Sequence, residues 1–75
     1  IELLNLTAKT ALSKKEYGIC LESYFEILDI TKNLNHSEET GTTLGKIGEI
    51  YYLNSSYDIA LNYFLKAYRL LLFAS

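Results

Sequence analysis

The two halves of the chain repeat one another at an offset of about 40 residues, and this repeat limits the fold more than any other feature. Leu4 aligns with Leu44, and Tyr17 aligns with Tyr57. Other aligned positions keep the identity or the size class of the side chain: Ile19 with Ile59, Leu21 with Leu61, Ala8 with Gly48, Cys20 with Ala60, Tyr24 with Phe64, and Ile30 with Leu70. Because a repeated packing interface requires small and large side chains at repeated places, we expect two similar structural units.

Each unit shows apolar residues at helical spacing. In the second unit, Leu44, Ile47 and Tyr51 recur at intervals of three and four, which is typical of one face of a helix. A second series of this kind follows the turn residues Asn54-Ser55-Ser56: Tyr57, Ala60, Leu61, Phe64, Ala67, Tyr68 and Leu71. The sequence predicts helices over about 1–14, 17–34, 38–54 and 57–73, and no proline interrupts them. Four helices joined by short connections pack as antiparallel neighbours, so the expected fold is all-α.

Capping residues predict where two of the helices begin. Ser55 is a favourable N-cap residue, and Asp58 lies three positions later, where a capping-box partner is expected. Glu38 and Glu39 are expected in the first turn of the third helix, where the helix dipole favours negative charge. The prediction is a single domain of residues 1–75, made of two antiparallel helix-turn-helix hairpins.

The second unit resembles the tetratricopeptide repeat. The residues that carry the resemblance, at the spacing of the family signature, are Leu44, Ile47-Gly48, Tyr51, Ala60, Phe64 and Ala67, with Tyr57 at the position that opens the second helix. The first unit matches through Leu4, Ala8, Tyr17, Cys20 and Tyr24, and departs from the signature at Thr7, Ala11 and Ile27. The resemblance implies two hairpins, residues 1–35 and 41–74, stacked as a right-handed α-solenoid fragment. It also implies that Leu44, Gly48, Tyr51, Ala60, Phe64 and Ala67 pack the repeats together.

The resemblance further implies a function and a set of binding residues. In this family the first helices of successive units line a groove that holds a peptide or a helix of a partner protein. By position, the groove residues here are Asn5, Lys9, Leu12, Thr42, Lys46, Glu49, Tyr52 and Leu53. The alternative is that these side chains are an ordinary solvated helix face. Recognition of a partner's C-terminal carboxylate is disfavoured, because Asn5 and Lys9 stand in exchanged places and Glu49 opposes an acidic ligand.

The period of about 40 exceeds the usual period of about 34 and leaves two other readings open. It is similar to the longer repeats of bacterial peptide-pheromone regulators, kinesin light chains, cell-polarity scaffolds and sensor segments of histidine kinases. The runner-up function is therefore the regulatory segment of a bacterial signalling protein, either a pheromone-gated transcription factor or a histidine kinase. The third is self-assembly. The last helix carries apolar residues outside its main stripe, so we expect self-association through Leu70, Leu72 and Phe73.

The chain also lacks an initial methionine, which favours a fragment of a longer repeat protein. Seven basic and nine acidic residues give a net charge of −2, without the clustered Lys and Arg that phosphate binding requires. No apolar run approaches the roughly 20 residues of a membrane span. A single cysteine fits a reducing compartment. We expect a protein or peptide partner, no direct nucleic-acid partner, no membrane and a cytoplasmic location.

No residue pattern supports catalysis, a metal or a cofactor. Cys20 occupies a small-residue position where helices cross, which favours a structural thiol over a nucleophile. His36 is the only histidine, and it has no second ligand at metal-binding spacing. Among the tyrosines, Tyr51, Tyr57 and Tyr68 are expected to serve packing. Tyr52 and Tyr63 are the better candidates for contact with a partner.

Overall fold

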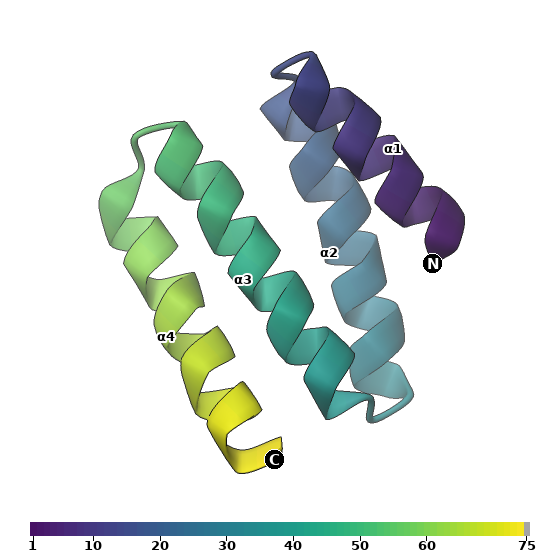
Figure 1. Ribbon diagram of the computed structural model, residues 1–75, viewed down its shortest axis with the longest axis vertical. Helices are drawn as coiled ribbons and strands as arrows, with labels where there is room; N and C mark the ends of the chain where they lie inside the picture. The colour runs from purple at the N-terminus through teal and green to yellow at the C-terminus, as the bar shows by residue number, and fades with distance from the viewer. Residues whose placement is uncertain (75) are drawn as a thin grey trace.

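The computed structural model describes residues 1–74 and places four α-helices there, α1 (Glu2–Ser13), α2 (Tyr17–Asn33), α3 (Ser37–Leu53) and α4 (Tyr57–Ala74) (Figure 1). No strand occurs within these residues. The all-α prediction is confirmed, and each predicted helix boundary lies within one residue of the observed one. The helices form two hairpins, α1–α2 and α3–α4, which pack together through α2 and α3.

The same turn joins every consecutive pair of helices. Lys15, Asn35 and Ser55 adopt left-handed backbone conformations with φ of 60°, 56° and 64°. In the first turn the Lys15 N–H donates to the Leu12 carbonyl at 2.9 Å, and the Glu16 N–H donates to the Ala11 carbonyl at 2.8 Å. Equivalent bonds form in the other two turns, so each turn is a Schellman motif that satisfies the last carbonyls of the preceding helix.

The Schellman motif corrects the predicted N-cap of α4, although the helix begins at Tyr57 as predicted. Ser55 is not an N-cap residue but the left-handed residue that ends α3. Ser56 therefore stands between the left-handed residue and the first residue of α4. The Ser56 carbonyl accepts the Ala60 N–H at 3.0 Å. The proposed Ser55–Asp58 capping box is wrong, because composition alone does not distinguish the residue that ends one helix from the residue that begins the next.

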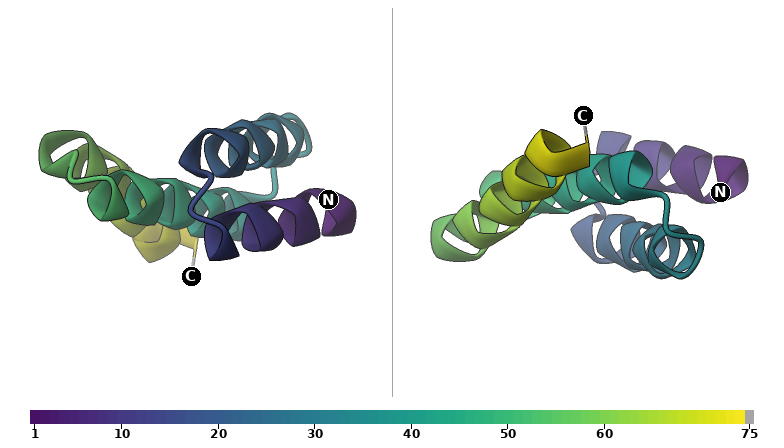
Figure 2. Two further views of the ribbon diagram at one scale, coloured as in Figure 1. Left: turned by 90° about the horizontal axis from the view of Figure 1, so that it is seen from above. Right: turned by 90° about the horizontal axis from the view of Figure 1, so that it is seen from below.

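The four helices form a flat molecule. Its Cα atoms extend over 34 × 28 × 15 Å, and α3 lies between α2 and α4 (Figures 1 and 2). One hydrophobic cluster joins the two hairpins, with Ala8, Ala11, Cys20, Tyr24, Ile27, Ile47 and Ile50 as its buried members. Figure 2 shows that α1 and α2 lie one above the other, so the helices do not form a single layer.

Small residues allow α3 and α4 to pack closely. Ala60 and Ala67 are buried on α4, as the sequence predicts for packing positions. A Cβ atom added at Gly48 would lie 2.9 Å from the Phe64 ring and 3.2 Å from the Ala60 carbonyl oxygen. At Gly41 it would lie 2.7 Å from Leu71. Glycine at Gly48 is therefore favoured by the distance between the helices and not by backbone conformation, whereas at Gly41 only the Leu71 side chain would have to move.

Replacing Gly48 tests this close approach. We expect Gly48→Ala to lower the free energy of unfolding by about 1–2 kcal/mol, because the overlap with Phe64 and the Ala60 backbone outweighs the better helix propensity of alanine. Gly18→Ala is the matched control, since nothing lies within 4 Å of a Cβ atom there. It should raise stability by about 0.5–1 kcal/mol. Urea unfolding followed by circular dichroism measures both, and equal shifts would contradict the packing argument.

The left-handed turn residues give a second prediction. A non-glycine residue pays roughly 1–2 kcal/mol to adopt this conformation, and glycine does not. We expect Lys15→Gly and Ser55→Gly each to raise the free energy of unfolding by about 0.5–1 kcal/mol, after the entropy of glycine is subtracted. Asn35→Gly should raise the free energy of unfolding by a smaller amount, since asparagine tolerates positive φ. A loss of stability in the Lys15 and Ser55 variants would show that these turns do not persist in solution.

Candidate functional site

The structure brings part of the predicted peptide groove together. A hollow of about 300 Å³, here called the α1–α3 groove, contains three of the predicted residues, Asn5, Thr42 and Lys46. Its other lining residues are Ile1, Ile27, Thr31, Glu38, Glu39 and Thr43. One cation faces two carboxylates here, and Glu39 Oε2 lies 2.9 Å from His36 Nδ1. The groove therefore has no marked preference for a ligand of either charge.

The other predicted groove residues do not line this hollow. They are Lys9, Leu12, Glu49, Tyr52 and Leu53. Leu12 packs against the core. Tyr52 and Leu53 are about half exposed, and the Tyr52 ring meets the Tyr57 ring edge-on at 5.4 Å between centroids.

A second and larger hollow lies between α2 and α4, over the first half of α3. This α2–α4 groove has a volume of about 610 Å³. Its lining is largely apolar, and its remaining residues are a threonine and three exposed cations: Leu28, Leu44, Tyr63, Leu70 and Phe73, with Thr40, Lys32, Lys66 and Arg69. A smaller hollow of about 250 Å³ continues it toward the α2–α3 turn and shares Lys32, Thr40 and Leu70. Among the residues that the structure describes, no acidic side chain lines either hollow.

Tyr63 lines the α2–α4 groove and is held in place by its aromatic neighbours. Its ring stacks on Tyr51 with 5.6 Å between centroids and an interplanar angle of 7°. Phe25 lies against the same ring at 6.3 Å, and Lys66 Nζ sits 5.3 Å from the ring centroid. Burial, with Tyr51 nearby, raises the pKa of the Tyr63 phenol, so the ring stays neutral beside the cations. Packing holds this tyrosine while one side of it faces the groove.

The tyrosine predictions are corrected in two places. Tyr51 packs as expected, but Tyr57 and Tyr68 are 59% and 64% exposed and are not buried in this chain, although the Tyr57 ring contacts Tyr52. Tyr63 combines packing with a place in the groove, whereas the sequence offers it only as a contact residue.

Sequence reasoning did not identify the α2–α4 groove. Leu44 is assigned to repeat packing by the family resemblance, and Leu70 and Phe73 are assigned to self-association, yet all three line this hollow. A local signal exists in Lys66, Leu70 and Phe73, which recur at helical spacing. No local signal joins them to Lys32, because only the packing of α2 and α4 on α3 brings that side chain to the same rim.

Burial lowers the reactivity of the single thiol. Cys20 is fully buried, and its Sγ–H donates to the Ala8 carbonyl at 3.3 Å. Burial raises the pKa of this thiol, which lowers the fraction of thiolate at neutral pH. Within residues 1–74, no three His, Cys, Asp or Glu side chains form a group that could hold a metal ion. None of the described helices combines the length and the apolar content needed to cross a bilayer.

We therefore expect Cys20 to resist modification in the folded chain. At pH 8 a thiol reagent should react about tenfold or more slowly with the native protein than with the protein in urea, because the reactive thiolate is disfavoured and covered. A variant with Cys20→Ala and Ser13→Cys carries its thiol on the exposed face of α1 and should react at similar rates in both conditions. Equal rates for native and unfolded wild-type protein would contradict the buried placement.

The α1–α3 groove and the α2–α4 groove thus both contain predicted binding or self-association residues. The α2–α4 groove is the larger, and it is rimmed by charge of a single sign. Comparison of the chain with family models, curated proteins and solved structures finds no match.

Proposed function

We propose that this chain is a protein- or peptide-binding module whose α2–α4 groove receives an acidic amphipathic helix of a partner protein. The observation that carries the proposal is the lining of that groove, in which three cations accompany apolar side chains from three helices. Such a surface matches a helix that has large apolar residues on one face and Asp or Glu beside them. The resemblance of the second unit to tetratricopeptide repeats, which bind peptides and helices, supports the same class of function.

The apolar floor supplies the binding free energy in this proposal. Leu28 of α2, Leu44 of α3 and Leu70 of α4 all line this groove, so three helices contribute to one surface. Covering an apolar surface contributes roughly 25 cal/mol for each Å² removed from water. Phe73 is 83% exposed and stands at the rim, where a partner side chain would cover it.

The cations supply selectivity. Lys32, Lys66 and Arg69 are three of the seven basic residues in a chain whose net charge is −2, so the groove is positive against a negative background. Complementary charge at a rim speeds association with acidic segments and penalises basic ones, while adding little affinity for each exposed pair. Binding through this groove should therefore weaken as the salt concentration rises.

The α1–α3 groove is the alternative surface for the same function, since Asn5, Thr42 and Lys46 meet there. It has about half the volume and both signs of charge, so it favours a smaller and more polar contact. Cys20 remains reduced in the cytoplasm, which we propose as the compartment in which the module works.

A designed peptide pair tests the function and the choice of surface. The first peptide is a helix with leucines on one face and glutamates flanking them, and the second has lysines in place of the glutamates. We expect fluorescence anisotropy to show saturable binding of the acidic peptide and no binding of the basic peptide. Lys66→Glu combined with Arg69→Glu should weaken that binding about tenfold or more, because two attractions become repulsions.

Lys46→Glu is the matched control, since it reverses one cation in the other groove. It should leave the affinity for the acidic peptide nearly unchanged. Loss of binding in this variant, with binding retained in the Lys66 and Arg69 variant, would move the site to the α1–α3 groove. Equal binding of the acidic and basic peptides, or binding of neither, would contradict the proposed function.

A further inference from the structure

Because the two hairpins repeat one another, the outer helices α1 and α4 can be compared with the α2–α3 interface between the hairpins. On α2, the face that packs on α3 contains Tyr24 and Thr31, which are 3% and 0% exposed. The aligned residues on α4 are Phe64 and Leu71, which lie against Gly48 and Gly41 of α3 on one side and are each still 37% exposed. Tyr68, which aligns with the partly buried Leu28, is 64% exposed. The α4 flank thus has the form of a surface that a helix like α3 covers elsewhere in the same chain.

The first helix shows the complementary half of that interface. On α3, the residues that pack toward α2 include Thr43, Ile47 and Ile50, which are 6%, 0% and 2% exposed. The aligned residues of α1 are Leu3, Thr7 and Thr10, and all three are exposed. Leu3 reaches 79% exposure, the second highest value among the large apolar side chains.

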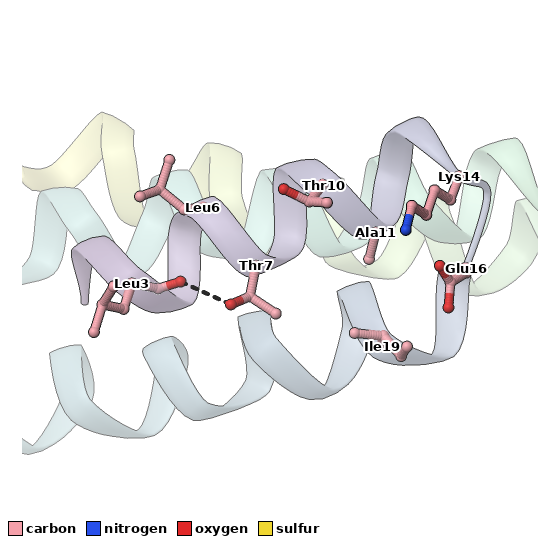
Figure 3. A pocket seen from close by; sticks show the side chains of 8 residues that line it. All are labelled: Leu3, Leu6, Thr7, Thr10, Ala11, Lys14, Glu16 and Ile19. Carbon is pink, nitrogen blue, oxygen red and sulfur yellow. Dashed lines mark hydrogen bonds between the residues drawn. The ribbon is translucent and has the colours of Figure 1, made fainter.

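These α1 residues border a hollow of about 350 Å³ between α1 and the beginning of α2 (Figure 3). Leu3, Thr7 and Thr10 line it from α1, and Ile19 lines it from α2. The Thr7 hydroxyl donates to the Leu3 carbonyl at 2.9 Å, so its hydrogen-bonding need is met within the helix. The α1 flank can therefore be covered by an apolar partner without leaving that hydroxyl unsatisfied.

We propose that a second copy of this chain docks head to tail, with its α1 flank seated on the α4 flank of the first copy. The contact would reproduce the packing of α3 on α2 within each chain, so the partner's shape is already present in the molecule. The α4 flank contains Leu61, Phe64, Tyr68 and Leu71, which recur at intervals of three and four along one side of the helix. Leu70 and Phe73 lie on another side, in the α2–α4 groove, so the assembly does not depend on the peptide-binding proposal.

Head-to-tail docking joins two different surfaces and leaves one of each free. Such a heterologous contact has no built-in end unless a ring closes, so the assembly grows as the concentration rises. Pairing of two α4 flanks, in contrast, uses one surface twice and stops at a dimer. The two arrangements therefore differ in the number of surfaces that they require.

Two single-surface variants test the proposal by sedimentation velocity. The wild-type weight-average mass should rise from the monomer value of 8.6 kDa past twice that value between micromolar and millimolar concentration. Leu3→Glu places a charge on the α1 flank, and Tyr68→Glu places a charge on the α4 flank. Both positions are exposed, so circular dichroism should show an unchanged fold. Each variant alone should stay at the monomer mass. An equimolar mixture should rise to twice the monomer mass and stop, because one intact pair of surfaces remains.

Leu53→Glu is the control, since Leu53 is 51% exposed and belongs to neither flank. It should associate as the wild type does. A wild type that stays monomeric throughout would overturn the proposal. So would a stop at the dimer that Tyr68→Glu abolishes and Leu3→Glu does not, which would mean that two α4 flanks pair. Loss of association in the Leu53 variant would indicate nonspecific clustering of apolar residues and would overturn it equally.

Discussion

The placement of α3 between two helices is the constraint on which the rest of this structure depends. One side of α3 packs on α2 through Ile47 and Ile50, and another packs on α4 through Gly48. Two threonines also become buried on this helix, because the Thr40 hydroxyl donates to the His36 carbonyl at 2.7 Å and the Thr43 hydroxyl donates to the Glu39 carbonyl at 2.8 Å. A threonine bonded in this way offers its methyl group to the neighbour and leaves no polar atom unsatisfied.

The same placement creates the groove. Because α3 separates α2 from α4, the side chains of those two helices approach each other only above it, and a hollow remains over Thr40 and Leu44. A side chain larger than Thr40 would fill part of that space. The close approach at Gly48 draws α4 toward α3 and fixes the position of Tyr63 on Tyr51. The packing that stabilises the second hairpin therefore also shapes the surface that we propose for binding.

The sequence predicts those features that depend on neighbours along the chain. Helical spacing places all four helices within one residue. The family resemblance assigns Gly48, Ala60 and Ala67 to packing, and in the structure Ala60 and Ala67 are buried and Gly48 lies against Phe64. Sequence reasoning fails where the answer depends on a distant segment. Periodicity marks Tyr68 as apolar and regularly spaced, but it does not tell whether a helix covers it, and in this chain none does. The cationic rim is missed for the same reason, since Lys32 and Arg69 belong to different hairpins.

The two proposals meet at the junction that head-to-tail docking would create. There, α4 of one copy and α2 of the next would flank α1, and a groove equivalent to the α2–α4 groove would form between copies. The residues that align with Lys66 and Arg69 are Glu26 and Asp29, so the junction groove would carry the opposite charge. An acidic helix would then bind the groove within each copy and be repelled from the groove between copies. Charge would thus set one site for each copy, and neighbouring sites held at a fixed spacing would favour a partner with several acidic helices.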